Sequence, residues 1–404
     1  MLSNTPLFDV IIGGAGIIGL SVARQLLRDN PSLRLAILEK EAGPAMHQSS
    51  RNSGVIHSGI YYEPGSAKAE NCLKGYKLLL DFVQEYGIPY RICGKVIAAV
   101  EETEVPALQQ IFQRGKLNGL TGVEILDAVA SKEAEPHVKA VESLWVPQAG
   151  IIDFGLVARE ISKQLLNDDV SFYYDHAITE IRHETHHVVV STTYGNFQAS
   201  LFINCCGLYA DRVATLTGMT GRYKILPFRG EFYSVGGTTA GRVRHLIYPV
   251  PDSRFPFLGV HFTPRLDGSV EAGPNAVLAF AREGYRLLDI NAGECSEILA
   301  YSGFHRMALR YWRKGWEEMH RSFSKEAFLK SARRLVPSVQ MQDMRYSRAG
   351  VRAQCVGSNG EMIHDYVILE DERVINLINT PSPAATSALS IGEFVAQNAL
   401  VKLS

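Results

Sequence analysis

One short segment near the N-terminus constrains the fold of this chain more than any other feature. Residues 14–19 read GAGIIG, so Gly14, Gly16 and Gly19 have the spacing G-x-G-x-x-G between an apolar run and a segment with helical periodicity. Glycines at this spacing let the backbone approach a pyrophosphate, and the free N–H groups at the start of the following helix attract its negative charge. The pattern predicts a strand, a phosphate-binding turn and a helix, the first unit of a Rossmann-like α/β domain.

An acidic residue at the end of the next strand supports this interpretation. A second apolar run, residues 33–38, leads to Glu39, and Lys40 follows it. A carboxylate at this place accepts hydrogen bonds from ribose hydroxyls and disfavours a 2′-phosphate, so NADP is not expected. We expect Glu39 and Lys40 to bind a dinucleotide. A glycine-rich turn without a ligand is the alternative, and the flanking strands, helix and acid make it the weaker hypothesis.

The segment that follows distinguishes FAD from NAD. An NAD domain would continue with another helix and strand, whereas residues 46–65 are rich in Ser, Asn, Gly and His. This composition is typical of a loop that wraps a ligand, and a solvated polar loop is the alternative. Hydroxyl, amide and guanidinium groups suit a pyrophosphate and a ribityl chain, and a glycine lets the backbone run beside a flat ring. The residues that we expect to contact FAD here are Ser49, Ser50, Arg51, Asn52, Ser53 and Gly54.

The composition of the whole chain limits its partners. A chain of 404 residues exceeds the size of a single hydrophobic core, so two domains are expected. Its 41 basic and 42 acidic side chains give a net charge of -1 without a dense basic block, so nucleic acid is not an expected partner. The histidines and cysteines lack the spacing of a metal site, so no metal is expected.

The sequence also bears on location. No apolar run reaches the roughly 20 residues of a membrane-spanning helix, so no transmembrane helix is expected. The first eight residues hold no basic side chain, unlike a secretory or mitochondrial leader. We therefore expect a cytoplasmic protein, and peripheral contact with the inner face of the cell membrane stays open.

Several segments beyond the N-terminal turn resemble one known family. They are His47-Gln48 and residues 52–59 (NSGVIHSG), 227–231 (PFRGE), 248–252 (YPVPD), 256–261 (PFLGVH), 273–280 (GPNAVLAF), 350–354 (GVRAQ) and 381–386 (PSPAAT). Together with the turn that ends at Glu39, they resemble the L-2-hydroxyglutarate dehydrogenases and oxidases, a branch of the FAD-dependent D-amino-acid-oxidase-like superfamily. The targeting leader of mitochondrial members is not seen, so a bacterial type of enzyme is expected.

The resemblance implies an architecture and an activity. The fold class is α/β, with a discontinuous Rossmann-like FAD-binding domain and a substrate domain made of a mostly antiparallel β-sheet plus helices. The expected FAD-binding domain comprises residues 1–85, 150–225 and 340–404, and the substrate domain residues 86–149 and 226–339. The implied reaction is the oxidation of L-2-hydroxyglutarate, a small 2-hydroxy dicarboxylate, to 2-oxoglutarate. Electrons would pass to a quinone, another electron-transfer partner or oxygen.

Further cofactor contacts follow from the same resemblance. Ile178 is expected at the end of a strand-like stretch near the adenine, and Gly207 follows an apolar strand that ends at the cofactor. Thr386 or Ser387 can cap a C-terminal helix whose positive end would face the flavin; a purely structural helix is the alternative. The turn before this helix supplies the expected contacts Pro383, Ala384, Ala385 and Thr386.

Oxidation of a 2-hydroxy acid needs a cation for the carboxylate and a base near the hydroxyl group. Amine-oxidising relatives place a carboxylate-binding arginine where this chain has Arg352, so Arg352 is the expected first anchor. Arg229 is the candidate for the far carboxylate, although an ion pair with Glu231 or another acid is equally expected. His57 is the preferred base because it lies in the FAD loop, and His261 is the rival.

Two other functions compete with this hypothesis. An amine or amino-acid oxidase of the glycine or sarcosine type would share the superfamily and the carboxylate-binding arginine, but the segments around Arg229 and Asn275 match the hydroxy-acid branch. A flavin-binding protein without catalysis is the third. Product analysis and flavin reduction by a hydroxy acid separate the three.

Overall fold

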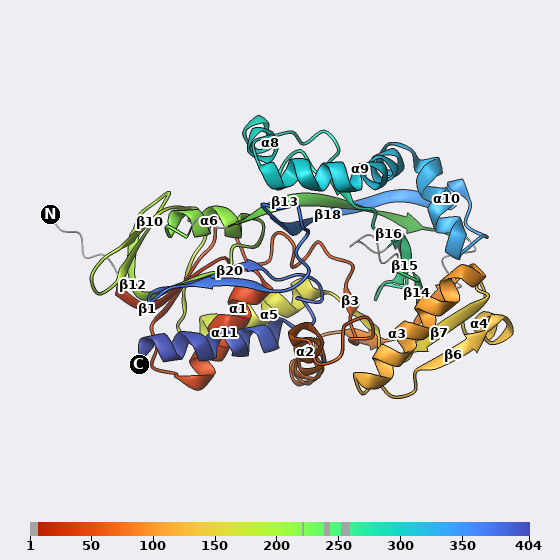
Figure 1. The fold of residues 1–404 in the computed structure, drawn as a ribbon. Coiled ribbons are helices and arrows are strands. Elements are labelled where there is room, and N and C mark those ends of the chain that lie inside the picture. The colour runs from red at the N-terminus through yellow and green to blue at the C-terminus, as the bar shows by residue number, and fades with distance from the viewer. Residues whose placement is uncertain (1–6, 220–221, 238–242, 252–258) are drawn as a thin grey trace.

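The computed structural model describes residues 7–219, 222–237, 243–251 and 259–404. Residue 252 and residues 256–258 of the segments compared above lie outside the described residues. The described elements form two large β-sheets with helices packed on them (Figure 1). The fold is mixed α/β, as the sequence predicted.

The first sheet has eight strands and contains the predicted dinucleotide-binding unit. Its strands are β1 (Leu7–Gly13), β2 (Leu35–Leu38), β9 (Ser171–Tyr173), β10 (Ile178–His183), β11 (Val188–Thr192), β12 (Asn196–Asn204), β19 (Val367–Glu370) and β20 (Val374–Asn379). Strands β9, β2, β1, β12 and β20 run parallel to one another, whereas β10, β11 and β19 add antiparallel pairs at the margins. The carboxyl ends of β1, β2 and β12 therefore meet at one edge.

Helices cover both faces of this sheet. Alternating residues of β1 face opposite sides, since Val10 and Ile12 belong to one core cluster and Ile11 to another. The first cluster includes the helices α1 (Ile17–Asp29), α2 (Ala67–Glu85), α5 (Phe154–Asn167) and α11 (Ala388–Leu403), and the second includes α6 (Ala210–Leu216). Figure 1 shows α1, α5 and α11 below the sheet and α6 above it. A Cβ atom on Gly392 would lie 2.6 Å from the Ser21 carbonyl oxygen, so this glycine allows α11 to pack closely on α1.

The second sheet has nine strands and is antiparallel except where β5 meets β14. Its strands are β5 (Lys95–Ala99), β6 (Glu124–Asp127), β7 (Glu142–Val146), β13 (Tyr223–Val235), β14 (Leu246–Pro249), β15 (His261–Pro264), β16 (Val270–Gly273), β17 (Val277–Leu278) and β18 (Met344–Gly357). Its helices are α3 (Val105–Leu117), α4 (Ala128–Ala134), α8 (Ala292–Leu299), α9 (Ser302–Phe323) and α10 (Lys325–Leu335). A small third sheet joins β3 (Val55–Ile56), β8 (Gly150–Ile152) and β4 (Tyr90–Ile92).

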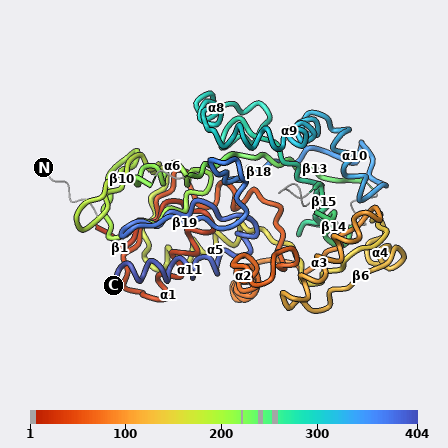
Figure 2. Tube along the Cα trace, viewed as in Figure 1, coloured from red at the N-terminus to blue at the C-terminus, as the bar shows by residue number. Residues whose placement is uncertain are grey.

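Two long strands connect the regions of the molecule. Strands β13 and β18 pair along their length, and Figure 2 traces them from the neighbourhood of α6 toward α10. Strand β18 lies within the segment 340–404 that we expected in the FAD-binding domain, yet its partner is in the nine-stranded sheet. The two large sheets draw on alternating parts of the chain, and the domain boundaries themselves stay a prediction. Among the described residues, no helix combines the length and apolar character needed to cross a bilayer.

Candidate active site

A cavity of about 490 Å³ lies where β1, β2 and β12 end. Ligands of open α/β sheets bind at the carboxyl ends of the strands, so this is the expected place for a dinucleotide. The wall contains residues from the ends of these strands, from the following loops and from α6. They are Gly14, Gly16, Leu38, Glu39, Lys40, Ala45, Met46, His47, Gln48, Ser49, His176, Ala177, Ile178, Thr179, Cys205, Cys206, Gly207, Leu208, Tyr209, Arg212, Val213 and Leu216.

The glycine-rich turn has the geometry that the sequence predicted. Gly14 has φ +100°, and a Cβ atom there would lie 2.6 Å from the Cys205 carbonyl oxygen. Helix α1 has Gly16 as its N-cap, which offers no side-chain oxygen of its own, and the Ile17 N–H donates to the Ser49 hydroxyl at 2.9 Å. The start of the helix and Ser49 together form the predicted pyrophosphate site. Glu39 is fixed at the cavity wall because its carboxylate accepts hydrogen bonds from the N–H groups of Ala15 (2.8 Å) and Glu41 (3.0 Å).

Some of the predicted cofactor residues line the cavity, and the others lie in α1, in the neighbouring loop and in the turn before α11. Those that line the cavity are Gly14, Gly16, Glu39, Lys40, Ser49, Ile178 and Gly207. Gly19 lies inside α1, where its missing side chain allows the turn to close. One detail of the prediction was wrong, because Ile178 begins strand β10 and does not end one.

The remaining loop residues shape the chain around His57. The Asn52 amide donates to the Ser49 carbonyl at 2.8 Å, and the Asn52 side-chain oxygen accepts from Gly54 N–H. Ser50 donates to Ala45 O, Arg265 donates to Ser53 O, and the Arg51 guanidinium lies over the Tyr285 ring. Direct contact of residues 50–54 with FAD stays a prediction.

The turn before α11 meets the same loop. The Thr386 hydroxyl accepts a hydrogen bond from the His57 N–H at 3.1 Å, and Thr386 is 1% exposed. Ser387 is the N-cap of α11, but its side chain makes no capping hydrogen bond, so this part of the capping prediction was wrong. Residues 383–386 therefore lie beside the His57 loop, while their contact with the flavin stays a prediction.

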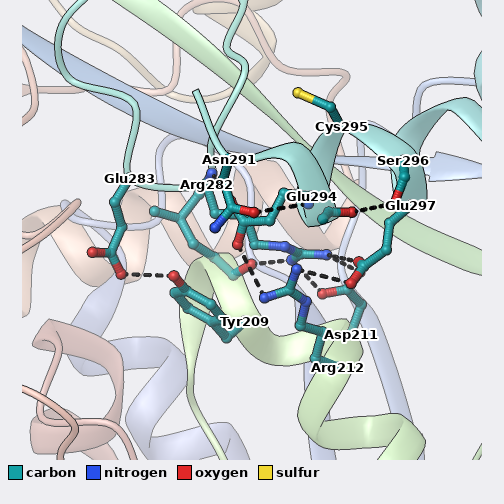
Figure 3. Close-up of polar contacts among 12 residues, drawn as sticks. Tyr209, Asp211, Arg212, Arg282, Glu283, Asn291, Glu294, Cys295, Ser296 and Glu297 are labelled. Atoms are coloured by element: carbon teal, nitrogen blue, oxygen red, sulfur yellow. Dashed lines mark hydrogen bonds and ion pairs between the residues drawn. The ribbon is translucent and has the colours of Figure 1, made fainter. Parts of the chain in front are cut away.

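Several residues of the cavity wall were not predicted from the sequence. Arg212 donates to Glu294 (3.0 Å) and Glu297 (3.1 Å), and the nearby Arg282 forms a buried two-pronged pair with Asp211. Figure 3 shows this network, which connects α6 to α8. The rule that ligands bind after parallel strands could have indicated Cys205, which follows β12; no local pattern marks Arg212, because its partners are distant in sequence.

Lys40 lies in a cluster of ionisable groups at the cavity rim. Ligand-type atoms of Glu41, His47 and Glu283 lie within 4.8 Å of one another. The Lys40 ammonium group pairs with both carboxylates. Burial alone would lower the pKa of Lys40, but the bonds to Glu283 and Glu41 outweigh it and raise the pKa. The carboxylates are thus compensated by a cation of the chain itself.

A second cluster unites the predicted chemical residues His57, His261 and Arg352. Burial, with nearby Lys95 and His261 adding to it, holds the pKa of His57 well below its usual value. Burial likewise lowers the pKa of His261 to about 3, and the ring stacks on Tyr248 at 3.9 Å. Burial also lowers the pKa of Arg352, which acts electrostatically on both histidines. The cluster is basic, and its histidines are neutral at pH 7.

Arg229 is arranged differently. Its guanidinium group is 2% exposed and lies 3.2 Å from the Glu231 carboxylate. It also donates to the Arg286 carbonyl oxygen (2.9 Å) and to the Ser322 hydroxyl (3.1 Å). The structure therefore contains the ion pair that was the alternative for Arg229, and a substrate contact stays a prediction.

Comparison with known proteins agrees with this site. The family model described as FAD dependent oxidoreductase matches residues 9–398. A protein of Indibacter alkaliphilus named L-2-hydroxyglutarate dehydrogenase is 44% identical over 396 residues, which cover 97% of this chain and 99% of that protein. The proteins of the same name from Escherichia coli K12 and, as a mitochondrial protein, from Homo sapiens are 40% and 39% identical; they cover 96% and 98% of this chain, and the matches span 92% and 89% of their lengths.

Solved structures share the fold at lower identity. An L-alpha-glycerophosphate oxidase from Mycoplasma pneumoniae with FAD bound has a TM-score of 0.77 at 23% identity, covering 98% of this chain and 94% of that one. Glycine oxidase from Geobacillus kaustophilus has a TM-score of 0.74 at 18% identity, with 98% and 95% covered. The cofactor is FAD, and the chain belongs to the FAD-dependent oxidoreductase family, in the branch of the L-2-hydroxyglutarate dehydrogenases.

Proposed function

We propose that this protein oxidises L-2-hydroxyglutarate to 2-oxoglutarate. The observation that carries the proposal is the basic cluster of His57, His261, Lys95 and Arg352 at the predicted FAD loop, in which Lys95 and His261 are buried and His57 and Arg352 are half-buried. A group of cations and neutral imidazoles suits an anionic substrate that must lose a proton. The names of the relatives at 39–44% identity support the same substrate.

The chemistry divides between the cofactor and the chain. Bound FAD supplies the acceptor for the hydride from the carbinol carbon. Arg352 holds a carboxylate of the substrate through paired N–H donors. His57, which is neutral because burial lowers its pKa, takes the hydroxyl proton while the carbonyl group forms. We assign this role to His57 because its backbone N–H is fixed by Thr386 in the predicted FAD loop.

Anaerobic absorbance of the FAD-loaded protein tests this assignment. L-2-Hydroxyglutarate should bleach the flavin rapidly and yield 2-oxoglutarate, whereas D-2-hydroxyglutarate, L-lactate, glycine and sarcosine should not. Bleaching by an amine alone, with release of ammonia from an amino acid, would replace the proposal with an amine oxidase. A flavin that none of these compounds reduces would leave a flavin-binding protein without this activity.

We further propose that the electrons pass to a membrane quinone and that α9 docks on the membrane surface. Helix α9 exposes large apolar side chains on one face: Leu309 (78%), Trp312 (62%), Trp316 (74%) and Phe323 (65%). Exposed arginines flank this face, namely Arg306, Arg310 and Arg313. Tryptophan and leucine beside arginine are typical of a helix that lies in the interface of an anionic bilayer. Figure 1 shows α9 on the outer side of β13 and β18, where a flat surface can reach it.

Sedimentation with vesicles checks the docking surface. The FAD-loaded protein should bind vesicles that contain phosphatidylglycerol more strongly than vesicles of phosphatidylcholine alone. The double change Trp312→Ser and Trp316→Ser should weaken binding by about tenfold or more, because it removes the aromatic groups that enter the interface. Leu117→Ser is the matched control, since Leu117 is 74% exposed on α3. Equal binding by the Trp variant, or a stable dimer that forms through α9 without lipid, would contradict the proposal.

A further inference from the structure

Lys95 is a buried cation, and the stability of the protein gives no reason for its position. It is the first residue of β5, its side chain is 0% exposed, and Nζ has no hydrogen-bond partner among the described residues. Burying an ammonium group without an anion costs free energy, and a buried lysine is normally paired. Burial lowers the pKa of Lys95 to about 8, which is consistent with an uncompensated site.

Aromatic rings surround the ammonium group but do not satisfy it. Nζ lies 4.2 Å from the centre of the Tyr248 ring and 5.2 Å from that of Tyr61. Cation–π contacts stabilise the charge, yet they leave the N–H donors available. Two other polar atoms near these rings also lack a partner in the described part of the chain: Tyr61 Oη and His261 Nε2. Three buried polar groups therefore gather around Tyr248 with free hydrogen-bonding capacity.

The charge of this neighbourhood calls for an anion. Lys95 acts electrostatically on His57 and His261, as Arg352 does, so two cations and two imidazoles share one region. Within the ranges that the structure describes, no carboxylate forms an ion pair with Lys95. The other cation proposed for a far carboxylate, Arg229, is held by Glu231 and Ser322.

We propose that Lys95 binds the carboxylate of the substrate that is remote from the reacting carbon, and that it selects dicarboxylates over monocarboxylates. Arg352 then holds the carboxylate next to the carbinol carbon, so the two ends of a five-carbon diacid are bound by two different cations. The Tyr61 hydroxyl, which lacks a partner among the described residues, is the second donor that we assign to the remote carboxylate. This inference rests on the proposed oxidation of L-2-hydroxyglutarate and adds the residue that determines its specificity.

The test compares the FAD-loaded wild type with Lys95→Met, which keeps the length of the side chain and removes its charge. Glutarate, which carries no hydroxyl group, serves as an unreactive ligand, and its binding is followed by the shift in flavin absorbance. Lys95→Met should bind glutarate roughly a hundredfold more weakly, as expected when a buried charged partner is removed. The concentration of L-2-hydroxyglutarate for half-maximal bleaching should rise similarly, while L-2-hydroxyvalerate, which has a methyl group in place of the remote carboxylate, should behave as with the wild type.

Stability and a control variant separate binding from a structural role. If Lys95 binds an anion, Lys95→Met should not lower the melting temperature of the ligand-free holoprotein, because the substitution removes an unpaired buried charge. Lys68→Met is the matched control: Lys68 also acts electrostatically on His57, but its ammonium group donates to the His364 carbonyl oxygen. This variant should keep its affinity for glutarate. Lys95→Gln provides a second neutral variant and should repeat the result of Lys95→Met.

Several outcomes would overturn the assignment of Lys95. They are unchanged glutarate affinity in both neutral variants, an equal loss of affinity for the diacid and the monoacid, or a lower melting temperature with loss of FAD in both. A wild type that binds glutarate but is not reduced by L-2-hydroxyglutarate refutes the proposed reaction and leaves Lys95 as an anion-binding residue. A wild type that is reduced, with neutral variants reduced at the same concentrations, refutes the role of Lys95 alone.

Discussion

Replacing His57 with alanine should slow flavin reduction by L-2-hydroxyglutarate by at least ~10²-fold, within the ~10²–10⁴-fold range of general-base catalysis. The imidazole is the proposed acceptor of the hydroxyl proton, and burial keeps it neutral because its pKa lies well below the usual value. A base with a lowered pKa stays unprotonated as the pH falls through 6.5, so the wild-type rate should not decline there. Stopped-flow absorbance under anaerobic conditions measures both effects.

The loop should survive this change. The contact of residue 57 with Thr386 uses the backbone N–H group, which alanine retains, so the FAD content of His57→Ala should equal that of the wild type. His261→Ala is the matched control, because His261 is the other histidine of the cluster, and its pKa is likewise lowered by burial. Its effect should be smaller than that of His57→Ala. A full rate in His57→Ala together with a slow His261→Ala would transfer the role of the base to His261.

Gly19→Ala should produce a protein that no longer retains FAD. A Cβ atom at this position would lie 2.2 Å from the Gly14 carbonyl oxygen, a contact that requires the backbone of the turn to move. The turn and the start of α1 are the part of the chain that we predict to receive the pyrophosphate, so a small displacement should remove the phosphate site. We expect the ratio of flavin to protein absorbance after purification to fall by about tenfold or more, as overpacking of 1–3 kcal/mol acts on the bound state.

A neighbouring glycine provides the control for this substitution. Gly43 follows β2 near the same cavity, and nothing lies within 4 Å of a Cβ atom built there. Gly43→Ala should therefore purify with its full complement of FAD. Full occupancy in Gly19→Ala would show that the turn tolerates the displacement and that close packing at this position is not required.

The sequence predicted those parts of the site whose residues are close together in the chain. Gly14, Gly16 and Glu39 belong to one strand–turn–helix–strand unit, so spacing alone indicated their role and their place at the end of β1 and β2. Lys95 carried no such pattern, because a lysine at the start of a strand looks like a surface residue until Tyr248 from a distant strand covers it. The fold class could be predicted for the same reason, because the strand–turn–helix–strand unit that indicates it is contiguous in the sequence.

Other details depended on tertiary contacts that no local pattern reveals. From the sequence, Arg229 could contact the substrate or form an ion pair. Only the approach of Ser322 from α9 and of the Arg286 carbonyl oxygen shows how its donors are used. The start of β10 at Ile178 was misplaced because the polar residues around it resemble a strand end. Hydrogen bonding with β11 extends the strand from Ile178 onward.

The order of the strands also determines when the cofactor cavity can exist during synthesis. Strand β1 carries the glycine-rich turn, yet its parallel partner β12 is made far later, and β12 in turn pairs with β20 near the end of the chain. Helix α1 packs against α11, which is synthesised more than 300 residues later. The nucleotide-binding unit is thus completed only after β12, β20 and α11 have been synthesised, and the nascent protein stays without a finished flavin site until then.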